Sequence, residues 1–313
     1  MRRGSLLINP GLKTENPGSL NLHRHLPESL MLPPALIDFH VHLFPDKGFE
    51  AIWQHFASQG MPVRYPYYSR QCLDYLDRQG VKIIVFSNYA HKPGIAKPMN
   101  EWNLRLLDQF SHLYCFAAYH PGDVDALADA EQMLAHPRVI GIKLHFQVQR
   151  FYPHDERLFP LYEKIIQRKK RLLLHVGNGP IGNAFVGLAQ FKKVLDRYPD
   201  LPANIPHMGG LEFKSFIELT AEHPQIYLDT AFSFWPNLPF TFNLGPEYLE
   251  KYQDRIVYGS DFPNIMLPRE GEIDYLKSLG LSEECYQKIF FKNGLKLLAR
   301  ACPESKDLAG IRP

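Results

Sequence analysis

Residues 35–44 read ALIDFHVHLF, an apolar stretch that carries two histidines, His40 and His42. Its length and its content of Val, Ile, Leu and Phe are typical of a strand buried on both faces. Because side chains at positions i and i+2 of a strand point to the same side, the two imidazoles are expected to lie together. Asp38 is expected on that same face, where it either steadies a ligand or is a satisfied buried carboxylate.

Seven further apolar runs follow, separated by segments with helical spacing. They are VKIIVFSNYA (81–90), LYCFAAYHP (113–121), VIGIKLHFQV (139–148), RLLLHVG (171–177), PANIPHMGG (202–210), QIYLDTAF (225–232) and IVYGSDFPN (256–264). Eight strands that alternate with helices predict a (β/α)8 TIM barrel of the α/β class. The competing doubly wound sheet would have a Gly-rich phosphate turn after the first strand, and Pro45-Asp46-Lys47-Gly48 is not one.

The barrel is expected as a single domain over residues 35–300. Residues 1–34 are rich in Pro, Asn, Gly and Ser without periodicity, which indicates an N-terminal tail or arm. Residues 301–313 are expected as a C-terminal tail. Asn100 and Ser282 are expected to cap the helices that follow them.

Composition excludes several classes of protein. The chain has 35 Lys and Arg against 33 Asp and Glu, a formal net charge of +2, which favours neither nucleic acid nor a membrane surface as partner. The four cysteines lie far apart without a Cys-x-x-Cys pair, so free thiols in a reducing cytoplasm are expected rather than disulfides. We therefore expect a cytoplasmic protein whose partner is a small-molecule substrate.

Several predicted strands end in a histidine or an aspartate. These residues are His40, His42, His120, His145, His175, His207 and Asp261. In a parallel barrel the carboxyl ends of the strands share one rim, where barrel active sites lie. A donor set of three nitrogens and one carboxylate oxygen, which suits Zn²⁺, comes from His40, His42, His175 and Asp261. Mn²⁺, Fe²⁺ and Co²⁺ are open alternatives. His120 and His145 are either further rim residues or hydrogen-bonded core histidines.

At these residues the sequence resembles the amidohydrolase superfamily, and most of all its amidohydrolase 2 (amidohydrolase-related) branch. That branch includes aminocarboxymuconate-semialdehyde decarboxylase and related enzymes that act on small carboxylated substrates. The matching motifs are DFHVHLFP, LLLHVGNGP, IPHMGG and VYGSDFPN, within residues 35–300. The resemblance implies one divalent metal on His40, His42, His175 and Asp261. It also implies catalytic roles for His207 and Asp261 at the metal-activated water, and a homodimer as in many relatives.

The fourth strand leaves an alternative open. Some binuclear members of the superfamily bridge two metals with a carbamylated lysine near the position of Lys143, and His207 would then be a ligand of the second metal. Otherwise Lys143 contacts a substrate carboxylate as a point charge, with His145 and Arg150 as further substrate-binding residues. The aromatic segments 64–68, 232–236 and 240–242 are expected either to form an apolar wall of the site or to pack onto the barrel or onto a second subunit.

Three functional hypotheses follow. The resemblance implies a metal-dependent hydrolase that directs an activated water at a small, carboxylated substrate. The same ligands would serve a metal-dependent non-oxidative decarboxylase of a small acid, aromatic acids included, because the loops decide what is positioned. The third hypothesis is a metal-binding barrel without catalysis. The presence of His207 argues against a barrel without catalysis, since stability alone does not require that residue.

Overall fold

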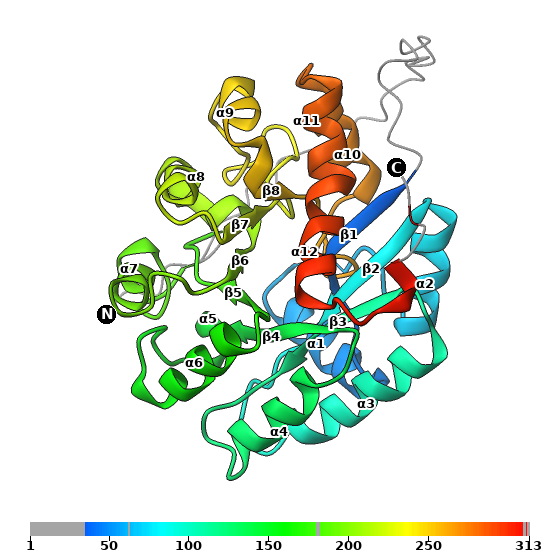
Figure 1. The fold of residues 1–313 in the computed structure, drawn as a ribbon. Helices are drawn as coiled ribbons and strands as arrows, with labels where there is room; N and C mark the ends of the chain where they lie inside the picture. Colours follow the sequence, from blue (N-terminus) through cyan, green and yellow to red (C-terminus); the bar gives the residue numbers. More distant parts are fainter. Residues whose placement is uncertain (1–34, 62, 180–181, 309–310, 312–313) are drawn as a thin grey trace. The chain divides into compact units, whose positions relative to one another are not determined.

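The computed structural model describes residues 35–61, 63–179, 182–308 and 311. Within residues 35–308 eight parallel strands are surrounded by helices (Figure 1). The (β/α)8 barrel predicted from the sequence is therefore confirmed, whereas the expected arm of residues 1–34 lies outside the described residues. Among the helices of the described residues, none combines the length and the apolar character needed to cross a bilayer.

The strands follow one another around the sheet in chain order, each parallel to the next. They are β1 (Leu36–His42), β2 (Val81–Ser87), β3 (Leu113–Ala118), β4 (Val139–His145), β5 (Arg171–His175), β6 (Ala203–Ile205), β7 (Ile226–Asp229) and β8 (Ile256–Val257). All eight lie within the predicted runs, but the last three are short. β6 ends at Ile205 because Pro206 has no amide N–H to donate to the ladder. His207 therefore follows its strand instead of ending it.

The barrel closes along a seam between β1 and the segment that contains β8. The amide of Phe39 donates to the carbonyl of Tyr258 at 2.8 Å, and the amide of His42 donates to the carbonyl of Phe262 at 2.8 Å. Pairing thus continues beyond the two residues of β8. As a result, the loop that carries Asp261 is fixed against β1.

Helices cover the outside of this ring (Figure 1). The α-helices are α1 (Asp46–Ser58), α2 (Ser69–Arg78), α3 (Ala96–Gln109), α4 (Ala126–Leu134), α5 (Phe146–Gln149), α6 (Phe159–Gln167), α7 (Leu188–Arg197), α8 (Phe213–Glu222), α9 (Pro246–Lys251), α10 (Arg269–Ser278), α11 (Glu283–Gln287) and α12 (Asn293–Ala301). The 3-10 turns are η2 (Glu156–Leu158), η3 (His207–Glu212), η4 (Gln253–Arg255) and η6 (Lys306–Leu308). A π turn, η5 (Lys288–Lys292), joins α11 to α12.

The two predicted helix caps have different outcomes. Ser282 caps α11, because its hydroxyl accepts from the amide of Cys285 at 3.2 Å. The prediction for Asn100 was wrong, since α3 begins at Ala96 and contains it. Its amide group instead pairs with Ala118 of β3, donating to the carbonyl at 2.9 Å and accepting from the N–H at 2.8 Å. A buried tertiary contact here prevails over the local capping preference.

Strand side chains alternate between two apolar layers, which explains why the predicted runs are almost continuously apolar. On β2, Ile83 and Val85 join a cluster that gathers side chains from β1 to β5, β7 and β8 and so fills the barrel interior. Ile84 and Phe86 belong to the larger layer between strands and helices. Helix α12 contributes Leu297 and its neighbours to the interior cluster, and contacts β1, β4 and β8.

β1 changes sides in its alternation between Asp38 and Val41, where its register against β2 shifts. Phe39 belongs to the interior cluster, whereas Val41 belongs to the outer layer. The expectation that Asp38 shares a face with His40 was therefore wrong. The carboxylate of Asp38 instead lies 3.4 Å from the guanidinium of Arg269 at the start of α10. Bulges of this kind re-aim side chains beside functional sites.

Candidate metal centre

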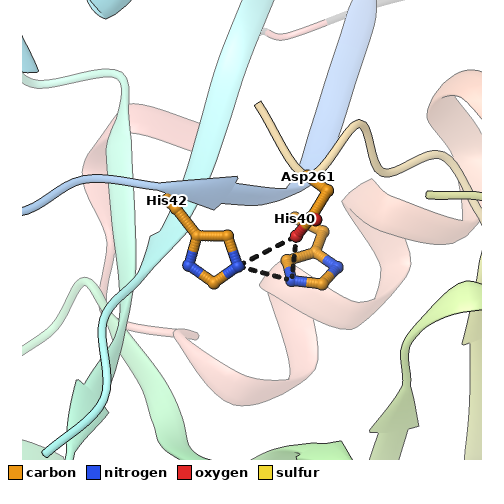
Figure 2. A group of neighbouring side chains, drawn as sticks. All are labelled: His40, His42 and Asp261. Atoms are coloured by element: carbon orange, nitrogen blue, oxygen red, sulfur yellow. Dashed lines mark hydrogen bonds and ion pairs between the residues drawn. The ribbon is translucent and has the colours of Figure 1, made fainter. Parts of the chain in front are cut away.

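His40, His42 and Asp261 point toward one another at the carboxyl ends of the strands (Figure 2). The Nε2 atom of His42 lies 2.9 Å from Oδ1 of Asp261, and Nε2 of His40 lies 3.3 Å from the same oxygen. The two Nε2 atoms are 3.2 Å apart. One ligand atom from each residue lies within 4.8 Å of the others. Three converging N and O donors form the kind of arrangement that binds a divalent cation.

Asp261 reaches this group from the loop after β8, four residues beyond the strand. Its amide donates to the carbonyl of His40 at 2.8 Å, and its φ of +59° lies in the left-handed region. Such strain is typical of functional sites. Gly259 allows the close approach, since a Cβ added there would lie 2.7 Å from Cβ of His40. The loop therefore depends on a residue without a side chain.

Asp229 at the end of β7 connects two of the histidines. Its Oδ2 lies 2.9 Å from Nδ1 of His40, and its Oδ1 accepts from the amide of His207 at 3.0 Å. The Asp229 carboxylate thus faces Nδ1 of His40, and Nε2 is the ring nitrogen that faces His42 and Asp261. Burial raises the pKa of Asp229 to about 6, and the neighbouring His207 opposes that rise. Sequence reasoning missed this residue, although LDTAF ends its strand in an aspartate.

His207 lies in the turn that follows β6, with a φ of +59°. Its Nδ1 is 3.0 Å from the carbonyl of Ala231, which assigns the proton to Nδ1 and leaves Nε2 free to accept one. The centroid of its ring is 5.5 Å from that of His40 and 4.9 Å from that of His175. His207 therefore stands between the group of three and β5.

His175 and His145 end the neighbouring strands β5 and β4, and their rings stack with centroids 4.0 Å apart. His175 lies outside the group of three. Its Nε2, Nδ1 of His145 and the buried Nζ of Lys143 have no hydrogen-bond partner among the described residues. Buried polar atoms without partners are costly, so these three nitrogens favour an additional ligand over simple core packing.

Burial sets the protonation of these groups. It lowers the pKa of His40, His145 and His175 well below the ordinary value for histidine, so their rings are neutral. Burial would raise the pKa of Asp261, but the hydrogen bond to His42 and the nearby histidines outweigh it and hold that pKa below its usual range. Neutral imidazoles and an ionised carboxylate are the forms that bind a metal.

Lys143 is fully buried on β4. Burial lowers the pKa of its ammonium group to about 8, although Asp261 and Asp229 act in the opposite direction. A lysine with so little hydration and no direct partner fits a site that receives an anion or a polar substrate group.

A buried ion pair between Asp38 and Arg269 lies next to the seam between β1 and the segment that contains β8. Oδ1 of Asp38 accepts from the amides of His40 at 3.3 Å and Ser260 at 3.1 Å, while its Oδ2 faces Arg269. Burial raises the pKa of Asp38 to about 6, and the Arg269 charge opposes the rise. Asp38 thus ties β1 to α10 through Arg269, and to the loop that carries Asp261 through the amide of Ser260. Sequence reasoning missed Arg269 because an arginine that begins a helix carries no recognisable pattern.

Two residues singled out from the sequence lie apart from this group. Nδ1 of His120 accepts from the amide of Gly122 at 3.0 Å, and its ring packs edge-on against Phe151. His120 is therefore a hydrogen-bonded core histidine, one of the two alternatives left open. Arg150 is exposed at the end of α5 and forms no ion pair within the described residues.

Comparison with known proteins yields a family match and several shared folds. A family model described as amidohydrolase matches residues 37–300. A search of curated proteins finds no match to the chain.

Three solved structures illustrate the shared fold. An uncharacterised TIM-barrel protein from Bordetella bronchiseptica is 16% identical, covering 85% of this chain and 99% of its own, with a TM-score of 0.67. The 5-carboxyvanillate decarboxylase of Novosphingobium aromaticivorans, complexed with manganese and 4-hydroxy-3-methoxy-5-nitrobenzoic acid, is 12% identical, with coverage of 84% and 96% and a TM-score of 0.60. The 4-oxalomesaconate hydratase of Rhodopseudomonas palustris is 19% identical, with coverage of 86% and 97% and a TM-score of 0.55.

At these identities the structures show a common barrel, and the family follows from the match over residues 37–300. That span includes β2 to β8, all of β1 except Leu36, and every residue of the group described above. The chain belongs to the amidohydrolase family of metal-dependent enzymes.

Proposed function

We propose that the protein is a metal-dependent hydrolase that directs an activated water at a small, carboxylated substrate. The convergence of His40, His42 and Asp261 next to His207 is the observation that supports this proposal most directly. His40, His42, His175 and Asp261 are assigned as the ligands of one divalent cation. The free Nε2 of buried His175 supports its place as the fourth donor.

Zn²⁺ is the proposed metal because its usual donors are the imidazole nitrogens and carboxylate oxygens found here. Mn²⁺, Fe²⁺ and Co²⁺ accept the same donors, and the manganese in the 5-carboxyvanillate decarboxylase supports Mn²⁺ as the first alternative. When bound, such a cation supplies Lewis acidity that lowers the pKa of water toward about 7 and polarises a carbonyl.

His207 is assigned as the catalytic base. Its Nδ1 is held by the carbonyl of Ala231, and its backbone is held by Asp229, so its Nε2 keeps a fixed direction. It accepts a proton from the attacking water and returns it to the leaving group. Asp261, which its histidine neighbours keep ionised, is assigned as the second proton carrier.

Lys143, His145 and Arg150 are assigned to substrate binding. A substrate carboxylate would give Nζ of Lys143 the partner that it lacks, and Nδ1 of His145 lacks one as well. Arg150, exposed at the end of α5, is placed as an anion anchor at the entrance. The alternative remains that Lys143 is carbamylated and bridges two cations, in which case His207 is a ligand and no longer a base.

A second candidate reaction is the non-oxidative decarboxylation of a small aromatic acid. The observation that favours it is the ring of Tyr89, which packs 6.0 Å from the ring of His42 and 4.8 Å from that of His145. An aromatic ring beside His42 and His145 suits a benzoate-like substrate. The decarboxylase with the same fold was complexed with such an acid. In this reaction the bond between the ring carbon and the carboxylate would break, CO₂ would leave, and the ring carbon would take a proton from water that His207 orients.

Replacement of His207 by Ala in the metal-loaded enzyme tests the proposal. Small esters, amides and lactones are screened beside carboxylic acids, and the parent's best substrate is carried forward. We expect turnover to fall by about 10²–10⁴-fold while elemental analysis still finds the metal. His55→Ala, which removes an exposed histidine of α1, is the matched control and should keep the parent's turnover.

Loss of the metal together with turnover would make His207 a ligand and overturn the mononuclear assignment. A parent protein that takes up neither Zn²⁺ nor Mn²⁺ would overturn the proposed metal centre. Cleavage of acids alone, with release of CO₂, would replace hydrolysis by the decarboxylase candidate.

Location and assembly are part of the proposal. A cytoplasmic location is supported by the four cysteines, which are all buried free thiols. A homodimer is proposed from the resemblance to the amidohydrolase 2 branch. Light scattering on the purified chain tests it, and the mass of a single chain would contradict it.

A further inference from the structure

A cavity of about 380 Å³ lies at the amino-terminal ends of β5, β6 and β7, beside the last turn of α12. Its charged lining residues are Lys169, Lys170, Arg171, Arg300 and Asp200. Four cations thus face a single carboxylate. An adjoining cavity of about 200 Å³ shares three of these cations and adds Arg168, His136 and Glu304.

Two of the cations are buried. Lys170 is 8% exposed, and Arg171 is 6% exposed. Nζ of Lys170 donates to the carbonyl of Val139 at 2.7 Å. Nε of Arg171 donates to Oδ1 of Asn204 at 2.6 Å, and its Nη2 donates to two backbone carbonyls at 2.9 and 2.8 Å. Every one of these acceptors is neutral, so the hydrogen bonds are satisfied while the two positive charges are not.

The other cations are exposed and also lack acidic partners. Lys169 follows α6 and Arg300 lies in the last turn of α12. Neither forms an ion pair in the part of the chain that the structure describes. Burial lowers the pKa of Lys170, and it lowers that of Arg171 to about 10. Among the described residues, four cations therefore line the cavity with Asp200 as the only carboxylate, and the folded protein concentrates net positive charge here.

We propose that this cavity binds a small polyanion, a molecule that carries a phosphate group or several carboxylates. Its volume lies within the range of about 300–1,000 Å³ that small-molecule sites occupy. Lys169 and Arg300 supply exposed donors for the anion, and the buried charges of Lys170 and Arg171 line the same cavity. A run of basic residues is often only a solvated surface, but burial of two of the four cations sets this one apart.

This site is separate from the candidate metal centre. β5 begins with Arg171 at the cavity and ends with His175 at the opposite end of the barrel. The proposal uses no residue assigned to the reaction and does not depend on which reaction the enzyme performs.

Calorimetric titration of the full-length holoenzyme tests the proposal. Inorganic phosphate and tricarballylate, a tricarboxylate that chelates metals weakly, are titrated separately at constant ionic strength, so the two arms separate phosphate from carboxylate recognition. We expect saturable binding at the cavity, weakened at least about tenfold in the double variant Lys169→Gln/Arg300→Gln, whereas any anion bound at the candidate metal centre should be unaffected by these substitutions. The control Lys192→Gln/Lys193→Gln removes the same charge from exposed positions of α7 and should keep the parent's affinity.

A second measurement needs no variant. In the parent protein, saturating phosphate or tricarballylate should protect Lys169 from acylation while leaving Lys192 reactive, as read by peptide mass spectrometry. The proposal is overturned if neither anion shows saturable binding up to on the order of 10 mM. Equal weakening in both double variants, unchanged affinity in the cavity variant or equal acylation of both lysines would overturn it as well.

Discussion

β5 carries a histidine at one end and an arginine at the other, and the surroundings of the two differ in kind. At the carboxyl end, His175 and its neighbours His145 and Lys143 keep buried nitrogens that find no hydrogen-bond partner in the described part of the chain. At the amino end, Arg171 has hydrogen bonds to three neutral oxygens but forms no ion pair with any residue that the structure describes. One end lacks partners for individual atoms, and the other lacks an opposite charge.

The difference indicates what each end accepts. Neutral imidazoles with ionised Asp261 attract a cation whose coordination they complete, and geometry matters most there. Satisfied cations attract an anion through their combined field, and the exact position of each donor matters less. Substitutions at the carboxyl end should therefore act through single atoms, and substitutions at the amino end through total charge.

The largest expected effect is that of Asp261→Asn. The change keeps the shape of the side chain and removes the charge that faces His40 and His42, so metal content should fall and turnover should drop by about 10³–10⁴-fold. Elemental analysis and steady-state kinetics measure the two effects. Asp196→Asn, at an exposed position of α7, should leave both unchanged. If Asp261→Asn kept the parent's turnover, the carboxyl ends of the strands would not be the site of the reaction.

Asp229→Asn should have the next largest effect. Asp229 faces His40 with one carboxylate oxygen and accepts from the backbone amide of His207 with the other. Asparagine is neutral and has a single oxygen, so it cannot keep both contacts. We expect metal affinity to fall by about 10–100-fold, as for other groups that orient metal-bound histidines. Competition with a chelator measures the affinity. An unchanged value would mean that Asp229 does not orient His40.

Gly259→Ala tests how tightly the carboxyl end depends on position. The new methyl group would lie 2.7 Å from Cβ of His40, so the loop must move and unfolding free energy should fall by about 1–3 kcal/mol. Gly271→Ala in α10 is the control, since its methyl group would meet no atom closer than 3.7 Å and its helix favours Ala. Denaturant unfolding compares them. Equal stability of the two variants would contradict the close packing at the seam.

The smallest effects concern two buried cations, one at each end of the barrel. In the metal-free protein, Lys143→Met should raise unfolding free energy at pH 7 by about 1–2 kcal/mol, because it removes a buried charge without a partner. Arg171→Met should lower it by about 1–3 kcal/mol, because two buried oxygens and the partly buried carbonyl of Gln225 lose their donor.

The gain in Lys143→Met has a defined pH dependence. The pKa of Lys143 is about 8 in the folded protein and 10.5 as its ordinary value. Below pH 8 the lysine is charged in both states and the gain is complete. Between these two values the unfolded parent binds more protons, so the parent becomes more stable as pH rises and the gain shrinks. Denaturation at pH 7 and pH 10 measures it, and a gain that grows with pH would contradict the assignment.

The barrel could be predicted from the sequence because strands buried on both faces leave long apolar runs. The histidines at the carboxyl ends could be predicted because parallel strands bring such ends together. The shift in β1 that places Asp38 and His40 on different faces could not be predicted. It depends on how the backbone between Asp38 and Val41 pairs with β2. Asp229 was missed because one aspartate at the end of a strand is no motif.

The remaining misses share a physical cause, which is that their partners are distant in the chain. The local sequence around Asn100 is typical of a helix cap, but its side-chain amide forms hydrogen bonds with the backbone of Ala118 in β3. The structural role of Arg269 is its ion pair with Asp38, which lies on the first strand and is distant in sequence. The cavity gathers residues from α6, β5 and α12, and sequence order gives no sign that Lys169 and Arg300 face the same space.

The seam between β1 and β8 joins the first and last strands of the barrel, which sets when a newly made chain can bind a metal. His40 and His42 belong to the first strand, whereas Asp261 follows the last, so a growing polypeptide carries two of the three converging donors long before the third exists. Contacts so distant in sequence form late in folding. Metal capture should thus mark completion of the barrel, and a chain released from the ribosome before residue 256 should bind no ion at His40 and His42.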